Sequence, residues 1–215
     1  MRVPPIVRGG LSVRLPILVA GLFLCACGIV AFLEAELGLP PWDVLHQGLA
    51  EQTPLSFGAA NVAVSVVVLA ASALLGARIG LGTVLNALLI GTFVIGLTAI
   101  ETVDELSDSA LGGRVVLMGA ALALFGVGSA LYIGADLGAG PRDSLMVIAS
   151  RRLGVRLGVS RTAIELVALV AGVVLGGTVG VGTLVFALGI GPAVELSFRA
   201  LARSPLAVPA VASAA

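Results

Sequence analysis

Six long apolar segments, separated by short polar or glycine-rich breaks, make up most of the chain. Each is close to the roughly 20 residues that a helix needs to cross a bilayer, and none alternates apolar with polar residues as the strands of a membrane barrel do. A helix satisfies its backbone hydrogen bonds within itself, so the pattern predicts an all-α integral membrane protein with six transmembrane helices. The expected spans are residues 15–36, 57–77, 82–100, 115–134, 160–177 and 182–199.

The composition agrees with a membrane protein. Hydrophobic residues make up 59% of the chain and charged residues 11%, which leaves too few polar groups to cover a surface in water. The net charge is zero, and the cations are arginines that lie in loops rather than along one helix face. We therefore expect the lipid bilayer as a partner and no nucleic acid.

The second half of the chain repeats the first at an offset of 100 residues. The pattern divides the chain into repeat 1 (14–100), an acidic external linker (101–113) and repeat 2 (114–200), between cytoplasmic segments at 1–13 and 201–215. The last segment is rich in Pro and Ala and is predicted to be disordered. The matching motifs are Gly38-Leu39-Pro40-Pro41-Trp42-Asp43 with Gly138-Ala139-Gly140-Pro141-Arg142-Asp143, and Gly80-Leu81-Gly82-Thr83 with Gly180-Val181-Gly182-Thr183.

The arginines predict the orientation. Short cytoplasmic loops collect cations, and with both termini in the cytoplasm every arginine except Arg114 lies on that side. Each repeat holds three spans, so repeat 2 enters the membrane from the opposite side. Two inverted three-helix repeats are therefore expected, an architecture that many secondary transporters use.

The repeated motifs resemble a known family. A Gly-x-x-Pro-x-Asp start, a helix after it, and Gly-x-Gly-Thr before an apolar helix that ends Ile-Gly are similar to the YczE/YitT group of bacterial multi-pass membrane proteins, most of all to its YczE-like branch. The resemblance covers about residues 14–200. It implies a multi-pass protein of the bacterial plasma membrane and assigns no catalytic residue.

A short helix is expected between the first and second spans of each repeat, at 41–53 and 141–153. Pro41 and Pro141 suit a first helical turn, and the carboxylates of Asp43 and Asp143 complement the positive end of the helix dipole. Two interpretations are open. The residues could be simple helix-start signals, or the helices could re-enter the membrane and bring both carboxylates to the repeat interface, where a cation or a protonatable group would bind.

The Gly-x-Gly-Thr motifs are expected to form tight turns between helices. Glycine allows the turn, and Thr83 and Thr183 are placed as N-caps of the helices that follow. The alternative is an anion held by the free N–H groups of these helix N-termini. No lysine and no paired arginine accompanies the motifs, and Gly-Lys-Ser/Thr is absent, so they are not P-loops.

A third set of candidates lies on the second span of each repeat. Asn61 and Ser65 in repeat 1 correspond to Arg161 and Glu165 in repeat 2, and a spacing of four places each pair on one helix face. A local ion pair explains Arg161 and Glu165. An intramembrane carboxylate is also a functional candidate, which ranks Glu165 behind the two aspartates.

The sequence does not favour an enzyme. His46 has no copy in repeat 2 and no His or Cys at ligand spacing, so it is interpreted as a lone interfacial residue, and no metal or cofactor is expected. Trp42 and Tyr132 are interpreted as interfacial anchors.

Two functions remain open. The first is a carrier or permease for a small solute or ion, with Asp43, Asp143, Glu165, Arg161 and Asn61 as candidate contacts. The second is an accessory protein that binds and stabilises another membrane protein or a biosynthetic complex. Glycine-rich helices would also allow a homo-oligomer.

Overall fold

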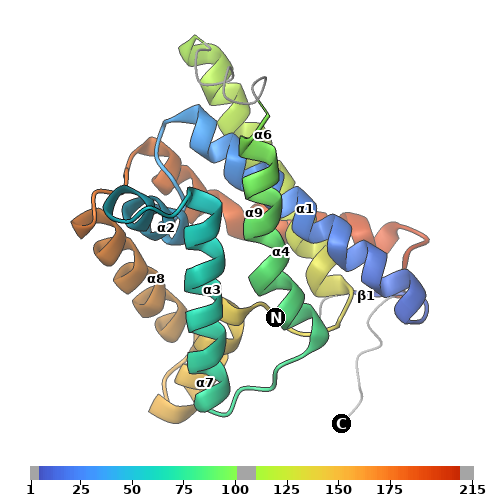
Figure 1. The fold of residues 1–215 in the computed structure, drawn as a ribbon. Helices are drawn as coiled ribbons and strands as arrows, with labels where there is room; N and C mark the ends of the chain where they lie inside the picture. The colour runs from blue at the N-terminus through green and yellow to red at the C-terminus, as the bar shows by residue number, and fades with distance from the viewer. Residues whose placement is uncertain (1–4, 101–109, 209–215) are drawn as a thin grey trace.

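The computed structural model describes residues 5–100 and 110–208 as a helical protein with one short strand pair (Figure 1). Within these residues five helices are long and apolar enough to cross a membrane, namely α1, α3, α4, α6 and α9. The remaining predicted span, 160–177, overlaps α8 (Leu157–Val174), and its crossing stays a prediction. Repeat 1 forms α1 (Leu11–Ala35), α2 (Pro41–Gln52), α3 (Phe57–Leu74) and α4 (Leu81–Thr98), and repeat 2 forms α6 (Leu111–Gly134), α7 (Pro141–Leu153), α8 (Leu157–Val174) and α9 (Val181–Arg203).

The first helices of the two repeats, α1 and α6, form an antiparallel pair at the centre. Arg14, near the start of α1, donates to the carbonyl of Ala135 at the end of α6 over 2.6 Å. Arg114, near the start of α6, donates to the carbonyl of Ala35 at the end of α1 over 2.7 Å. Each arginine thus satisfies a backbone acceptor that the partner helix leaves open at its C-terminus. Arg14 and Arg114 therefore have the same role in the two repeats.

Small residues allow these two helices to approach closely. A Cβ added to Gly21 would lie 2.7 Å from the carbonyl oxygen of Gly128, and one added to Gly128 would lie 2.6 Å from that of Gly21. In a bilayer, where lipid is as apolar as leucine, such close packing is a main source of helix association.

The short helices are exchanged between the repeats. Helix α2 packs against α8, and α7 packs against α3, while α4 lies along α1 and α9 along α6. A Cβ on Gly48 of α2 would lie 2.6 Å from the carbonyl oxygen of Gly172 of α8. The start of each short helix is therefore held at the interface between the repeats.

The two sequence motifs of one repeat interlock with those of the other. Gly182 N donates to Leu37 O and Gly82 N donates to Leu137 O, both over 2.7 Å. Gly38 adopts a φ of +106° and lies so close to Gly180 that a side chain would strike its backbone. We call each contact between a Gly-x-x-Pro segment and the opposite Gly-x-Gly-Thr turn a clasp.

The threonines of these turns do not act as predicted. Gly80 and Gly180 are the N-caps, and each threonine is the third helical residue. Its hydroxyl reaches back to accept a hydrogen bond from the cap N–H, over 3.1 Å at Thr83 and 3.2 Å at Thr183. Thr183 also donates to Leu39 O over 2.7 Å. In each motif one glycine N–H serves the clasp and the other is bonded to the motif's own threonine, so these four N–H groups are not free to bind an anion.

The two repeats differ in how the helices that carry their matching glycines pack. We call the contact region between α3 and α4, and the corresponding region between α8 and α9, a seam. Helix α3 packs along α4, and a Cβ on Gly91 would lie 2.5 Å from the carbonyl oxygen of Gly58. In repeat 2, α8 and α9 are apart, and Gly158 and Gly191 have nothing within 4 Å of an added Cβ. The α3–α4 seam is closed and the α8–α9 seam is open, although the same glycines stand at both.

The C-terminal segment is structured at its start, contrary to the prediction of disorder from 201 onward. Helix α9 continues to Arg203, and β2 (Ala207–Val208) pairs antiparallel with β1 (Ile6–Val7). The pairing fixes these residues at the ends of α6 and α9. Residues 209–215 and the acidic part of the predicted linker, 101–109, lie outside the described residues.

Candidate functional site

A cavity of about 140 Å³ with a mixed polar and apolar lining lies where the two repeats meet. All eight helices of the described residues contribute to its wall, so it is a product of the whole fold rather than of one repeat. Apolar residues such as Phe125 and Ile190 complete the lining. Its polar and aromatic lining residues include Trp42, Asn61, Ser65, Asn86, Ser129, Tyr132, Arg142, Asp143, Arg161 and Glu165.

Behind the cavity, the start of α2 carries a buried hydrogen-bonded chain. Asp43 and His46 are 1% and 0% exposed, and His46 Nδ1 lies 3.0 Å from Asp43 Oδ1. On the other side of the ring, His46 Nε2 lies 3.3 Å from Arg142 Nη2. Arginine only donates, so Nε2 accepts and the proton of a neutral ring is on Nδ1, where it is donated to Asp43. These hydrogen bonds connect Asp43 of repeat 1, through His46, to Arg142 of repeat 2.

Arg142 lies over the indole of Trp42, with its guanidinium carbon 4.9 Å from the ring centroid. The two residues occupy the same motif position in opposite repeats. Their contact is a cation–π interaction, and both line the cavity. Among the described residues Trp42 Nε1 finds no hydrogen-bond partner, although the side chain is only 8% exposed.

Asp143, the second predicted aspartate, lines the cavity itself. Tyr132 of α6 donates its hydroxyl to Asp143 Oδ2 over 3.1 Å. A carboxylate accepts about four hydrogen bonds, so this contact leaves capacity for a ligand. The two aspartates are therefore not equivalent, because Asp43 supports His46 from behind and Asp143 faces the cavity.

The third predicted set also lies at this cavity. Asn61 is 1% exposed, and its Nδ2 lies 3.2 Å from His46 Nδ1. Among the described residues Asn61 Oδ1 finds no hydrogen-bond partner. Because His46 Nδ1 is a donor, the amide is better satisfied with its oxygen towards the ring. Arg161 and Glu165 form the predicted ion pair over 3.0 Å, half-exposed at the cavity rim.

Sequence reasoning missed several members of the site, Arg142 among them. His46, Trp42 and Tyr132 were assigned to the membrane interface, but all are at least nine-tenths buried inside the protein. Asn86 of α4 was not singled out because its counterpart is Phe186, and the comparison of repeats selected positions that are polar in both copies. A polar residue opposite an apolar counterpart within a span is the signal that would have found Asn86.

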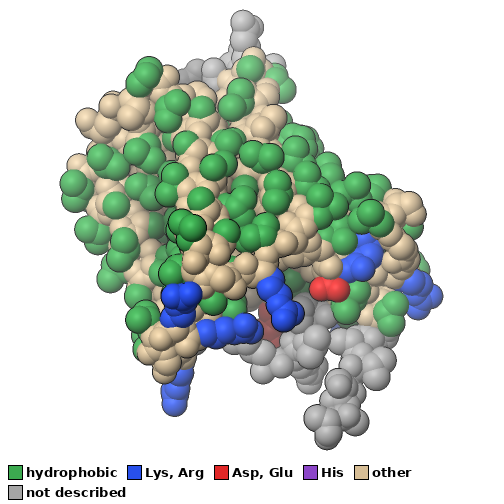
Figure 2. All heavy atoms as spheres, turned by 60° about the horizontal axis from the view of Figure 1, so that its bottom comes forward, with side chains coloured by type: hydrophobic (Ala, Val, Ile, Leu, Met, Phe, Trp, Pro, Cys, Tyr) green, Lys and Arg blue, Asp and Glu red, His purple; other side chains and the backbone are tan. Residues whose placement is uncertain are grey.

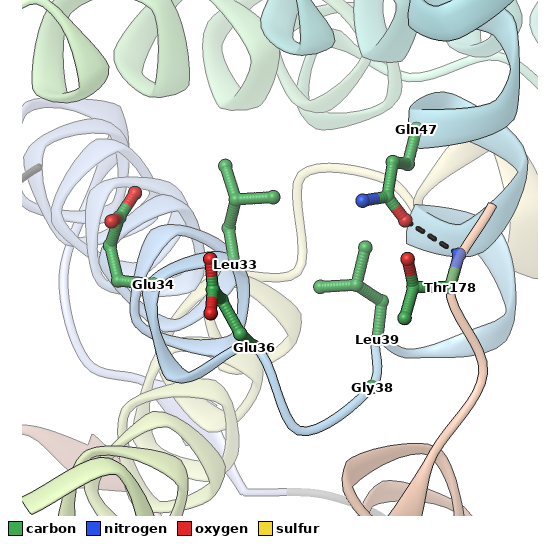
Figure 3. A pocket seen from close by; sticks show the side chains of 7 residues that line it. All are labelled: Leu33, Glu34, Glu36, Gly38, Leu39, Gln47 and Thr178. Atoms are coloured by element: carbon green, nitrogen blue, oxygen red, sulfur yellow. Dashed lines mark hydrogen bonds between the residues drawn. The ribbon is translucent and has the colours of Figure 1, made fainter. Parts of the chain in front are cut away.

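A second, larger pocket of about 490 Å³ lies at the C-terminal end of α1 (Figure 3). Glu34 and Glu36 line one side, and on the other Gln47 of α2 accepts a hydrogen bond from Thr178 N over 2.7 Å. None of the predicted aspartates, nor Glu165, contributes to it. The central cavity is therefore the better candidate site, since it combines charged residues of repeat 2 with uncharged polar residues of repeat 1.

The surface has the character of a protein embedded in lipid. Figure 2 shows apolar side chains over most of the visible face and arginines gathered along one border. The helices described here expose many large aliphatic residues, with Leu74 at 86% and Val174 at 80%. Fold, surface and composition together define a helical integral membrane protein.

Comparisons with known proteins place the chain in a family. A family of unknown function, DUF6198, matches residues 12–199, and the chain belongs to it. It is 32% identical over 171 residues to the uncharacterized membrane protein YczE of Bacillus subtilis, covering 79% of this chain and 78% of that protein. An uncharacterized protein of Haemophilus influenzae is 37% identical over 189 residues, covering 88% and 85% of the two chains. No solved structure matches. The predicted resemblance to the YczE-like branch is confirmed.

Proposed function

We propose that the protein is a carrier for a small solute or ion that exposes its central cavity alternately to the two sides of the bacterial plasma membrane. The observation that carries this proposal is the difference between the two seams. The same glycine pair is in contact at α3–α4 and apart at α8–α9, and the cavity lies between the two seams. A carrier needs one gate closed while the other is open.

An inverted arrangement of the two repeats would provide alternating access. Helices α1 and α6 run antiparallel, so two repeats of the same fold would enter the membrane from opposite sides. Exchange of conformation between such repeats opens one side as it closes the other. The arginines along one border of the surface (Figure 2) favour that border, and both termini, as cytoplasmic.

Helix α9 has a feature that would allow the open seam to close. Pro192 follows Gly191 directly inside this helix. Proline removes one helical hydrogen bond and favours bending at that point. Bending of α9 towards α8 would bring Gly191 to Gly158, as Gly91 meets Gly58 in repeat 1.

The test compares two matched positions one helical turn before the seam glycines. Ala87 is 0% exposed, whereas Ala187, its counterpart, is exposed. Single cysteines at these positions, in a Cys25→Ser/Cys27→Ser background, would be treated with a small water-soluble thiol reagent in membranes. A carrier that exchanges its gates reacts at both positions, and a protein fixed in the described conformation reacts only at Ala187→Cys.

A bulky side chain placed in the open α8–α9 seam provides the decisive control. Gly191→Leu should prevent α8–α9 closure and lower the labelling rate of Ala87→Cys at least about tenfold, which corresponds to about 1.4 kcal/mol. Gly119→Leu on α6, where an added Cβ also meets nothing within 4 Å, should leave it unchanged. Absence of Ala87→Cys labelling in every background would contradict the carrier and favour the accessory protein.

A further inference from the structure

The central cavity combines charges of both signs in a small volume. Arg142 and Asp143 lie on its wall, and Arg161 and Glu165 form its rim. A water molecule occupies roughly 30 Å³ of liquid, so about 140 Å³ admits a solute of about five non-hydrogen atoms. The ligand is therefore small and must satisfy a mixed lining.

One side of the cavity lacks hydrogen-bond acceptors. Trp42 Nε1 is a donor without a partner among the described residues. The guanidinium of Arg142 has five N–H donors, and one of those on Nη2 is directed to His46. A buried donor left unpaired costs free energy, and an acceptor group on a ligand would remove that cost.

The charge balance excludes a simple anion. Asp43 and Asp143 interact electrostatically with Arg142, and His46 is neutral in the hydrogen-bond arrangement described above. The buried cluster therefore carries one excess negative charge, which an anion would increase and an ammonium group on Asp143 would offset. A bare metal ion lacks an acceptor for Trp42, and the described residues include no group of three or more His, Cys, Asp or Glu that could hold one.

We propose that the cavity binds a small zwitterion of the amino-acid type, with its ammonium group on Asp143 and its carboxylate on Trp42 and Arg142. This inference names a substrate class for the carrier proposed above. It rests on that proposed function, because only a carrier would release the bound zwitterion on the other side of the membrane. Gly140 fits this arrangement, because a Cβ there would lie 3.4 Å from both Asp143 Oδ2 and Asn86 Nδ2 and would narrow the space beside the carboxylate.

The test measures binding of glycine, methylammonium and acetate to the purified full-length protein in detergent, by calorimetry and by the shift in melting temperature. Glycine carries both charged groups, and each of the other two probes carries one. Removing a hydrogen bond to a charged group costs about tenfold to a hundredfold in affinity, so glycine should bind at least about tenfold more tightly than either half.

Two variants connect the binding to the proposed contacts. Trp42→Phe keeps the ring over Arg142 but removes the unpartnered N–H. It should unfold at the wild-type temperature without ligand and bind glycine about tenfold more weakly. Asp143→Asn should also lower the affinity for glycine at least about tenfold. Glu195→Gln, which changes an exposed carboxylate away from the cavity, should leave the affinity unchanged.

Three results would overturn the inference. Methylammonium or acetate binding as tightly as glycine would show that one charged group is enough. Trp42→Phe binding glycine as tightly as wild type would place the carboxylate elsewhere, and absence of glycine binding would exclude the class. If these results occur while Ala87→Cys and Ala187→Cys both react, only the ligand class is wrong, whereas glycine binding without Ala87→Cys labelling would contradict the carrier.

Discussion

The closed seam can be tested by adding one methyl group to each of two equivalent glycines. In Gly91→Ala the new Cβ would lie 2.5 Å from the carbonyl oxygen of Gly58 and 2.5 Å from Val62 Cγ2. A backbone oxygen cannot rotate away, so α3 and α4 must separate. In Gly191→Ala the new Cβ meets nothing within 4 Å.

The difference between these variants isolates the cost of overpacking. Replacing glycine by alanine inside a helix favours the helix by about 1 kcal/mol, and this gain is common to both variants. Overpacking costs about 1–3 kcal/mol, and it applies to Gly91→Ala alone. For a chain of this size 1 kcal/mol corresponds to roughly 2–4 °C. Gly91→Ala should therefore melt about 2–12 °C below Gly191→Ala.

The assay is thermal unfolding of both purified variants in one detergent, with Ala87→Cys labelling as a second measurement. If the α3–α4 seam opens to relieve the clash, the strain appears as faster labelling of Ala87→Cys instead of a lower melting temperature. Equal melting temperatures together with equal labelling rates in the two variants would refute the closed seam and the argument built on it.

Two further predictions concern the clasp and the orientation. In thermal unfolding, Gly38→Ala should destabilise the protein by about 1–3 kcal/mol more than Gly154→Ala. Both glycines have a positive φ, but only Gly38 lies against another backbone. Equal effects of the two variants would contradict the clasp. Cysteines at Glu51 and Arg151, exposed counterparts on α2 and α7, should react with an impermeant thiol reagent from opposite sides of the membrane; reaction from one side would contradict the inverted repeats.

The sequence predicted the elements because the signals for them are local. Apolar length predicts the long helices, and Pro41 and Pro141 stand at the first residue of α2 and α7 as a proline in a first turn should. The partners of these motifs were not predictable. Gly38 meets Gly180 across more than half the chain, and nothing in a motif indicates which distant backbone it contacts.

The candidate site was predicted in part, for a related reason. The comparison of repeats identified Asp143 and Asn61, which both line the cavity. It placed His46 outside any site because the residue has no copy, although its hydrogen bonds to Asp43 and Arg142 depend on residues from both repeats. A site at an interface between repeats can use different residues from each, so similarity between the copies identifies only some of its members.

The open seam could not be predicted, because identical residues occupy different environments. Gly58 and Gly158 match, as do Gly91 and Gly191, yet one pair is in contact and the other is not. Gly91 and Gly191 lie inside their helices, where a glycine weakens the helix by about 1 kcal/mol relative to alanine. At Gly91 close packing against Gly58 offsets that cost, whereas at Gly191 the described conformation offers no such compensation. A second conformation in which α8 meets α9 would supply it, and the carrier that we propose requires that conformation.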